Sequence, residues 1–304
     1  MPSRFLAVDW GTTNLRAWVV GEDGRAEAHR EFALGVSKLG PGEAAMQFQD
    51  TVRPALNAED LPAVMCGMIG SNLGWKLAPY LDCPAGAADL RRALIRVEAE
   101  GPPVWIVPGL RSRRPDGGPD VMRGEETHVV GWAAEDPARC RGEQLICHPG
   151  THAKWVRLVD GRVESFVTSM TGELFDVLRK HSVLQVRESD DDEAAFDEGL
   201  RAAGDGNALA SRLFTARSRV VGGDMPPEQV KSYLSGLLIG AESAGVPALL
   251  GVAEGTPVAV IGDLKLARRY HRALEARGFS VSVYDGEEAV LSGLKALTHL
   301  DDMP

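Results

Sequence analysis

A short segment near the start of the chain combines an acidic residue, glycine and threonine in a pattern that suits phosphate binding. Asp9 stands where an apolar run stops, and Gly11, Thr12 and Thr13 follow. Glycine lets the backbone approach an anion, and threonine hydroxyls add donors. Asp9 could hold Mg²⁺ through water, because Mg²⁺ prefers one or two carboxylates together with substrate phosphates. An ordinary β-turn is the alternative interpretation of one such segment.

A second segment, His148 to His152, offers similar groups with two histidines added. Histidines four apart bind zinc when they share a helical face, but Pro149 and Gly150 interrupt a helix here, which argues against zinc. Lys154 follows, either as a solvated strand lysine or as a phosphate contact. Neither a Walker loop nor a GxGxxG that opens a helix occurs in the sequence.

The two segments occupy equivalent points of an apparent internal repeat. Placing Gly11 over Gly150 offsets the chain by 139 residues. A strand, a Gly-Thr turn, a second strand, a glycine-containing hairpin and a third strand then recur in the same order. A chance match is the alternative. A true duplication predicts two β-hairpins that face each other and present N–H groups and a threonine hydroxyl to one anionic ligand.

Two adjacent carboxylates, Glu125 and Glu126, stand at the start of a helix predicted over residues 125–134. Acidic residues at this position interact favourably with the helix dipole, which is one sufficient explanation for them. The functional interpretation is a general base that takes the proton of a substrate hydroxyl during phosphoryl transfer.

A glycine-rich segment, residues 67–75, leaves a predicted buried strand. Loops at strand ends commonly line ligand sites. Ser71 and Asn72 could hydrogen-bond a polyol there. Trp75 could cover the apolar face of such a ligand, and burial in the core is an equally good interpretation of that residue.

Strands and helices alternate along the rest of the chain. The patterns predict strands at 5–9, 15–20, 25–32, 63–66, 104–107, 145–147, 154–159, 258–261 and 280–284. They predict helices at 42–56, 125–134, 192–203, 207–217, 227–243, 264–277 and 286–298. This alternation indicates an α/β fold with a mixed or parallel sheet covered on both faces. Residues 111–119, which mix proline, glycine and charge, are predicted to be an exposed loop and a domain boundary.

Length and composition limit the class of protein. The chain has 304 residues, enough for two domains, and a net charge of −10, which argues against nucleic-acid binding because phosphate affinity needs clustered Lys and Arg. No apolar run approaches the roughly 18–20 residues of a membrane span, and no signal peptide is evident. The four cysteines show no CxxC spacing. We therefore expect a cytoplasmic protein with a small-molecule partner and neither nucleic acid nor membrane as partner.

Several segments in order resemble one family over nearly the whole chain, from about residue 5 to residue 298. They are VDWGTTNLRAW, GMIGSNLGW with APYLDCPA, PDVMRGEETH, PGTHAKW, SMTGELF with HSVL, and YLSGLLIGAE. This series resembles the 2-dehydro-3-deoxygalactonokinase family, in the sugar-kinase branch of the acetate kinase, hexokinase, Hsp70 and actin superfamily. The resemblance implies an actin-like ATPase fold with two ribonuclease H-like domains and an ATP cleft between them.

The resemblance also implies the division of the chain and its activity. The expected domains are residues 1–115 and 116–304, with the final helix 286–298 packing back on the N-terminal domain. The implied reaction is an ATP- and Mg²⁺-dependent phosphorylation of the 6-hydroxyl of 2-dehydro-3-deoxy-D-galactonate in galactonate breakdown. Alternatives are a kinase for another keto-deoxy sugar acid or aldonate, and a non-catalytic nucleotide-dependent sensor. A homodimer is a further expectation.

Roles for individual residues follow from the resemblance by position. Asp9 would organise Mg²⁺, and Gly262 with Asp263 would border the adenosine. The phosphate-binding residues would be Gly11, Thr12, Thr13, Gly150, Thr151, His152 and Lys154. The substrate-binding residues would be Arg16, Ser71, Asn72, Trp75 and Arg123. The substrate carboxylate needs a cation or a cluster of N–H groups, for which Arg16, Arg123 and Lys154 are the candidates.

The catalytic residue of this superfamily is usually an aspartate at a helix start before the second phosphate hairpin. Here that region holds Glu125 and Glu126, with Asp120 a few residues earlier. Glu125 is the expected base, and Glu126 and Asp120 are the alternatives. His148 departs from the apolar residue expected before Pro-Gly-Thr-His and could change the local polarity without changing the reaction.

Overall fold

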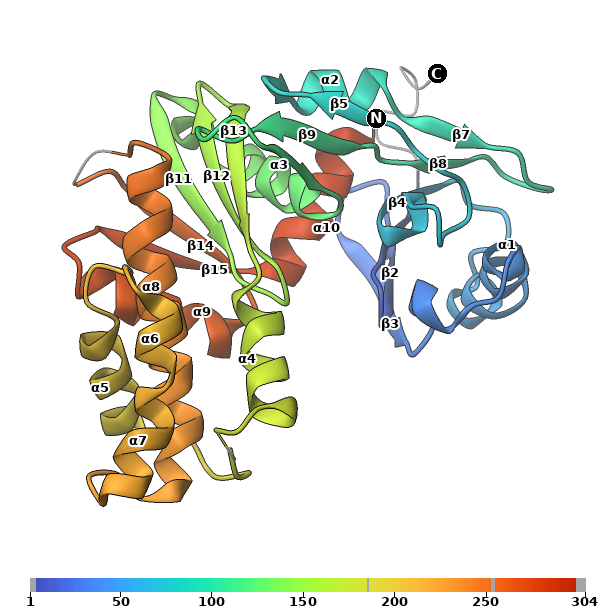
Figure 1. Cartoon of the computed structure of the whole chain (residues 1–304). Coiled ribbons are helices and arrows are strands. Elements are labelled where there is room, and N and C mark those ends of the chain that lie inside the picture. Colours follow the sequence, from blue (N-terminus) through green and yellow to red (C-terminus); the bar gives the residue numbers. More distant parts are fainter. Residues whose placement is uncertain (1–3, 185, 253–254, 299–304) are drawn as a thin grey trace.

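The computed structural model describes residues 4–184, 186–252 and 255–298. Two six-stranded sheets lie on either side of a pair of central helices, and further helices cover their outer faces (Figure 1). This arrangement confirms the predicted α/β class. The ends of the two predicted domains, residues 1–3 and 299–304, lie outside the described residues.

The first sheet has the strand order β3-β2-β1-β4-β8-β7. Its strands are β1 (Phe5–Trp10), β2 (Leu15–Val20), β3 (Ala26–Phe32), β4 (Ala63–Gly67), β7 (Ile95–Val97) and β8 (Val104–Ile106). β1 pairs antiparallel with β2 and parallel with β4, so both of its edges are hydrogen-bonded. Alternate side chains enter different cores: Leu6 and Val8 join the outer cluster, and Phe5 and Ala7 join the cluster around the central helices.

The second sheet repeats the order of the first and confirms the predicted duplication. The match is seen when its strands are read as β13-β12-β11-β14-β15, which correspond to β3-β2-β1-β4-β8. The order is β15-β14-β11-β12-β13-β6. The strands are β6 (Ala85–Gly86), β11 (Glu143–His148), β12 (Ala153–Val159), β13 (Arg162–Ser169), β14 (Val258–Gly262) and β15 (Val281–Asp285). β11 pairs antiparallel with β12 and parallel with β14, as β1 does with its neighbours. The two Gly-Thr turns therefore follow the same strand of each sheet.

A three-stranded sheet corrects one prediction. Its strands are β5 (Tyr80–Asp82), β9 (Gly109–Arg113) and β10 (Pro119–Met122), in the order β10-β9-β5. The predicted loop over residues 111–119 is wrong at its start, because residues 111–113 belong to β9 and pair with β10. Pro115, Gly117 and Gly118 form the hairpin turn between β9 and β10, and Pro119 begins β10. Gly117 has a φ of 87°, a backbone conformation that favours glycine.

Two central helices separate the sheets: α3 (Glu125–Glu135) and α10 (Gly286–Leu297). They cross so closely that an ideal Cβ on Gly131 would lie 1.9 Å from the carbonyl oxygen of Ala289, and one on Gly293 would lie 2.0 Å from that of Thr127. α10 also contacts β1, β4 and α2 (Ala87–Arg92). These contacts are consistent with the predicted return of the final helix, and the two-domain division itself stays a proposal.

Parts of the first half of the chain are attached to the second sheet. β6 pairs with β13 at Gly86 and Ala85, and the predicted boundary after residue 115 falls within the β9–β10 hairpin. Asp120 of β10 accepts hydrogen bonds from the backbone N–H of Thr168, at 2.7 Å, and from its hydroxyl, at 2.6 Å. The side chain of Asp120 therefore links β10 to β13 through two hydrogen bonds.

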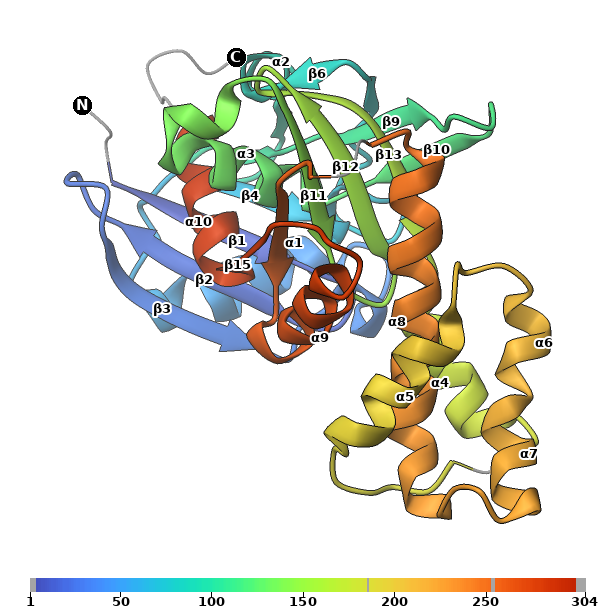
Figure 2. The ribbon, with the colours of Figure 1, turned by 90° about the vertical axis from the view of Figure 1, so that its left-hand side faces the viewer.

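A helical lobe extends below the second sheet (Figure 2). The helices there and beside the sheet are α4 (Thr171–His181), α5 (Glu193–Ala203), α6 (Leu209–Leu213), α7 (Thr215–Gly222), α8 (Val230–Leu249) and α9 (Leu264–Glu275). The helix predicted over 207–217 is wrong as one unit, since the Thr215 hydroxyl donates to the Arg212 carbonyl between α6 and α7. The predicted helix at 42–56 begins as α1 (Glu43–Gln47) and continues as a π and a 3₁₀ turn.

Among the helices within the described ranges, none combines the length and the hydropathy that crossing a membrane requires.

The crossing of α3 and α10 yields a stability prediction. Gly131→Ala should lower the free energy of unfolding by about 1–3 kcal/mol, because the added methyl group meets the α10 backbone and the helices must separate. Urea denaturation measures this. Gly245→Ala in α8 is the matched control, since its Cβ would meet nothing within 4 Å in the described part of the chain. It should be neutral or stabilising by up to about 1 kcal/mol. Equal effects of the two substitutions would contradict the close crossing.

Candidate active site

A cavity of about 470 Å³ opens where the carboxyl ends of β1, β4 and β11 meet the start of α3. Both Gly-Thr turns contribute to its wall, although they are far apart in the sequence. Of the predicted site residues, it is lined by Asp9, Gly11, Thr12, Arg123, Glu125, Gly150, Thr151, His152 and Lys154. The structure thus brings together residues from both halves of the duplication.

The first turn is held by the segment 35–37. The carbonyls of Thr13, Gly11 and Thr12 accept hydrogen bonds from the N–H groups of residues 35, 36 and 37, respectively. A Cβ on Gly35 would lie 2.1 Å from the Thr13 carbonyl carbon, so this close approach requires glycine. The N–H groups of Thr12 and Thr13 have no partner among the described residues. The turn therefore has free donors for an anion, while its carbonyls are already occupied.

The second turn is held by the first turn of α4. The Glu173 N–H donates to the Thr151 carbonyl at 2.9 Å, and a Cβ on Gly172 would lie 2.3 Å from the Gly150 carbonyl oxygen. His152 Nε2 lies 2.5 Å from a carboxylate oxygen of Glu173. The start of α4 thereby fixes both the backbone and the histidine of this turn.

Asp9 projects from β1 into the cavity. One carboxylate oxygen lies 3.7 Å from the Arg16 guanidinium, and the other lies 3.8 Å from Cys66 Sγ. Within the described ranges, no group of three or more His, Cys, Asp or Glu side chains is placed to hold a metal ion. A single carboxylate beside two Gly-Thr turns with the expected phosphate-binding role nevertheless fits Mg²⁺, which usually takes its other ligands from substrate phosphates and water.

The two glutamates of α3 have different environments. Glu125 lines the cavity; one of its oxygens lies 3.8 Å from Lys154 Nζ, and the other accepts the Arg123 N–H at 3.1 Å. Glu126 is fully buried, does not line the cavity, and accepts the Gly124 N–H with both oxygens, at 2.7 and 2.9 Å. Burial, and to a lesser extent the charge of Glu125, raise the pKa of Glu126 to about 8. At neutral pH Glu126 is therefore mostly uncharged.

Asp120, the third carboxylate considered, also does not line the cavity. Its oxygens accept the hydrogen bonds from Thr168 that connect β10 to β13. Of the three carboxylates, only that of Glu125 faces the space between the two turns.

Arg123 is a buried cation at the edge of the cavity. Its side chain is 8% exposed, its guanidinium lies 4.4 Å from the centre of the Tyr80 ring, and Nη2 donates to the Ala78 carbonyl at 2.8 Å. Nε and Nη1 are buried and have no partner among the described residues. An ideal Cβ on Gly70, which does not line the cavity, would lie 2.9 Å from Nη1, so this nitrogen is directed into the packed interior rather than into the cavity.

Three predicted substrate residues lie elsewhere. Ser71 accepts the Leu73 N–H, Asn72 is exposed, and the Trp75 ring packs 5.7 Å from Phe48. None of the three lines the cavity. The segment folds back on itself instead, because the Trp75 N–H donates to the Ile69 carbonyl.

The cavity is also lined by residues that the sequence did not predict as part of the site, notably Met68, Tyr80, Val121, Met122 and His128. His128 could have been found, since it lies three positions after Glu125 and so shares its helical face. Tyr80 and the apolar residues carry no signal in the sequence, because their position depends on the three-stranded sheet.

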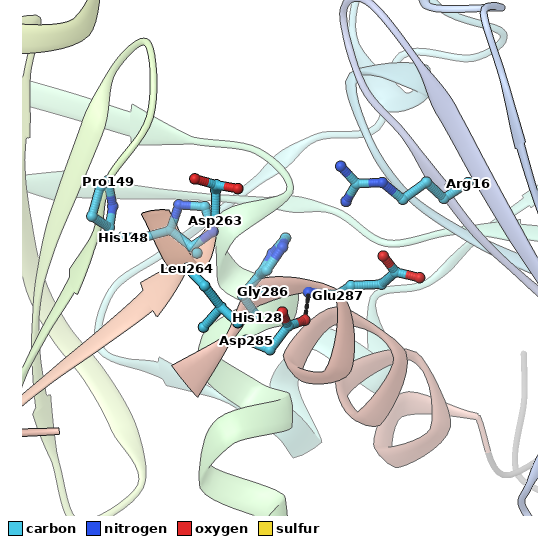
Figure 3. Close-up of a pocket in the computed structure, with 10 residues that line it drawn as sticks. Arg16, His128, His148, Pro149, Asp263, Leu264, Asp285, Gly286 and Glu287 are labelled. Carbon is cyan, nitrogen blue, oxygen red and sulfur yellow. Dashed lines mark hydrogen bonds between the residues drawn. The ribbon is translucent and has the colours of Figure 1, made fainter. Parts of the chain in front are cut away.

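A second cavity of about 330 Å³ adjoins the first on the β14 side (Figure 3). Gly262 and Asp263 line it, and Arg16 reaches toward it from the opposite sheet. His128 and His148, whose rings lie 4.5 Å apart edge to face, line both cavities. Burial and the neighbouring His128 hold the pKa of His148 well below its usual range. The junction between the cavities is thus polar but uncharged at His148.

Two ribonuclease H-like halves, each with a glycine-threonine turn at a shared cleft that also holds a carboxylate, define a kinase with the actin-like ATPase fold. The chain matches the model of the 2-keto-3-deoxy-galactonokinase family over residues 9–297, and it belongs to that family.

Relatives agree with this assignment. The chain is 39% identical over 300 residues to a Rhizobium meliloti (strain 1021) protein assigned as a 2-dehydro-3-deoxygalactonokinase, covering 96% of this chain and 95% of the relative. It is 38% identical over 303 residues to the 2-dehydro-3-deoxygalactonokinase of Escherichia coli (strain K12), covering 98% and 99%. A crystal structure from Sinorhizobium meliloti, also assigned as a 2-dehydro-3-deoxygalactonokinase, superposes with a TM-score of 0.86 at 38% identity, covering 96% of this chain and 97% of that one.

The buried Glu126 predicts a pH dependence of stability. An unfolded glutamate releases its proton near pH 4.5, whereas the folded Glu126 does so near pH 8. Between these values the folded state binds more protons, so the free energy of unfolding falls as the pH rises, by up to about 1.4 kcal/mol per pH unit. Glutamine does not ionise, so the free energy of unfolding of Glu126→Gln lacks this decrease with pH. The stability of the variant relative to the wild type should therefore increase from about pH 5 to pH 8. Urea denaturation across this range measures the difference.

The exposed Glu98, changed to Gln, is the control and should leave the pH dependence of unfolding unchanged. Parallel curves for the wild type and Glu126→Gln would show that Glu126 is ionised in the folded protein.

Proposed function

We propose that this protein is an ATP-dependent kinase that phosphorylates the 6-hydroxyl of 2-dehydro-3-deoxy-D-galactonate in galactonate catabolism. The observation that carries the proposal is the placement of Glu125 in a cavity lined by both phosphate turns. Membership of the family and the names of the relatives support the substrate.

In this proposal Glu125 is the general base. Its carboxylate takes the proton of the C6 hydroxyl while the oxygen attacks the γ-phosphorus and the bond to the β-phosphate oxygen breaks. Lys154 Nζ lies 3.8 Å from a Glu125 oxygen on the wall of the same cavity and would contact a phosphate oxygen of the nucleotide. Glu126 does not compete for the proton, because it is buried away from the cavity.

The remaining groups would hold the nucleotide. The free N–H groups of the first turn, with Thr151 and His152 of the second, would bind the phosphates, and Gly262 with Asp263 would border the adenosine. Mg²⁺, when bound, neutralises charge on the phosphate oxygens; Asp9 would hold it there. The Asp263 carboxylate already accepts the Leu266 N–H at the start of α9, so it would contribute mainly by shaping the loop.

Arg123 would recognise the substrate carboxylate. Tyr80 holds the guanidinium plane in place, and the side chain would have to turn its two buried, unpartnered nitrogens toward the cavity to bind the anion. Arg16 is less suited because it already pairs with Asp9, and Lys154 because it faces Glu125. Roles for Ser71, Asn72 and Trp75, a homodimer and a cytoplasmic location stay predictions from sequence.

Formation of ADP tests the proposal. The protein with Mg·ATP should turn over 2-dehydro-3-deoxy-D-galactonate with saturation kinetics and should prefer it to the gluconate epimer. Preference for a different keto-deoxy acid or an aldonate would establish the alternative kinase. Tight ATP binding without turnover of any sugar acid would favour the nucleotide-dependent sensor.

Glu125→Gln should reduce kcat by about 10²–10⁴-fold, because the C6 hydroxyl loses its base. ATP affinity, measured by calorimetry, should be unchanged. Glu126→Gln is the matched neighbour and should keep most of the wild-type kcat. An inactive Glu126→Gln beside an active Glu125→Gln would move the role of base by one residue.

Arg123→Met should raise KM for the sugar acid by about 10²-fold or more, since removing one partner of a buried charge pair costs about 2–5 kcal/mol. KM for ATP should not change, and the free energy of unfolding should fall, because the Ala78 carbonyl loses its donor and the Tyr80 ring loses its contact with the guanidinium. Steady-state kinetics and urea denaturation measure both.

Arg53→Met is the matched control. Arg53 is also buried and lies 4.7 Å from an aromatic ring, that of Phe48, but its guanidinium donates to carbonyls away from the cavity. That variant should lose stability and keep KM for the sugar acid. A rise in KM in both variants would indicate a general structural effect rather than recognition by Arg123.

A further inference from the structure

A further buried carboxylate, that of Glu242 in α8, lines neither of the two cavities. Glu242 is 6% exposed, and its two oxygens accept hydrogen bonds from Trp155 Nε1 at 2.5 Å and from the Tyr270 hydroxyl at 2.8 Å. Burial raises the pKa of Glu242, and hydrogen bonds from Thr171, Trp155, Tyr270 and Ser169 oppose that rise. Because a buried carboxylate is costly unless it is hydrogen-bonded, the fold keeps these four donors together around it.

Three of the four donors flank the second Gly-Thr turn. Trp155 follows that turn in β12. Ser169 ends β13, where it pairs with Ala153, the first residue of β12. Thr171 begins α4, and Tyr270 comes from α9. The buried carboxylate therefore ties the two strands after the turn to the start of α4.

The start of α4 passes this connection to the turn itself. Thr171 directly precedes Gly172, where an ideal Cβ would lie 2.3 Å from the Gly150 carbonyl oxygen. The Glu173 N–H donates to the Thr151 carbonyl at 2.9 Å. Because these contacts are so close, a shift of Thr171 would move Gly150 and Thr151 with it. The link between α4 and the buried carboxylate thus constrains the turn.

The same contacts bring together three of the segments that carry the family resemblance. Trp155 ends PGTHAKW, Ser169 and Thr171 belong to SMTGELF, and Glu242 ends YLSGLLIGAE. The proposed function gives roles to residues of the first segment alone. The hydrogen bonds to Glu242 connect the other two segments to it.

We infer that Glu242 is a positioning residue, which holds the second Gly-Thr turn where its groups reach the nucleotide phosphates. The inference rests on the proposed function for the role of that turn, and it adds a residue that contacts neither the nucleotide nor the sugar acid. Loss of Glu242 should weaken binding of Mg·ATP more than binding of the sugar acid, because the proposed contacts of the acid, Arg123 and Glu125, lie at the junction of β10 and α3.

Binding of Mg·ATP to the free enzyme, measured by calorimetry, tests the inference without relying on turnover. Glu242→Gln keeps the size of the side chain but replaces one acceptor oxygen with an amide nitrogen, which cannot accept a hydrogen bond. Kd for Mg·ATP should rise about tenfold, because the donors to that oxygen are released and the start of α4 shifts. KM for the sugar acid should stay within about twofold of the wild-type value, since its contacts are separate.

Thr171→Val removes only the hydroxyl of the link, and it keeps the test decisive if Glu242→Gln does not fold. It should raise Kd for Mg·ATP by about the same factor. The double variant should bind no more weakly than Glu242→Gln alone, because the two residues act through one contact. Factors that multiply in the double variant would show that the two residues act separately and would overturn the inference.

Thr215→Val is the matched control. Thr215 also begins a helix, α7, and its half-buried hydroxyl lies 2.7 Å from the Tyr233 hydroxyl, but it lines neither cavity. This variant should bind Mg·ATP as the wild type does. An unchanged Kd in either Glu242→Gln or Thr171→Val, or an equal rise in Thr215→Val, overturns the inference alone. A wild-type protein that does not bind Mg·ATP overturns the proposed function as well.

Discussion

The crossing of α3 and α10 is the constraint on which both cavities depend. Glycine at positions 131 and 293 lets the two backbones touch between the sheets. The N-terminus of α3 carries Glu125 to one cavity, and the N-terminus of α10, with Gly286 and Glu287, lines the other. Because α10 also contacts β1 and β4 of one sheet and β14 and β15 of the other, the distance between the sheets and the position of the carboxylate are linked through the same helix.

The site separates charged from uncharged groups despite the crowding of ionisable residues. Glu126 is neutral because it is buried next to another carboxylate, and His148 is neutral because it is buried next to another imidazole. Both groups lie close to ionisable side chains that line the cavity, such as Asp9, Glu125 and Lys154. The overall charge of −10 says little about such a site, since local burial decides which groups ionise.

The sequence predicts what is local and misses what depends on folding. Both Gly-Thr turns, the duplication and the paired glutamates follow from short patterns, because turn chemistry and strand alternation act over a few residues. Which glutamate faces the cavity depends on the Gly124 backbone, whose φ of 110° no pattern predicts. Tyr80 reaches Arg123 only through the pairing of β5 with β9, and Trp75 turns to Phe48 because its loop folds back.

The pairing of β6 with β13 has a mechanical consequence. Together with the bond between Asp120 and Thr168, it fastens the β5–β9–β10 sheet to the half that carries the second phosphate turn. Any rotation of one half against the other would therefore carry Tyr80 and Arg123 along with Thr151, while Asp9 travels with the opposite half. The hinge would lie between Asp9 on one side and Tyr80, Arg123 and Thr151 on the other.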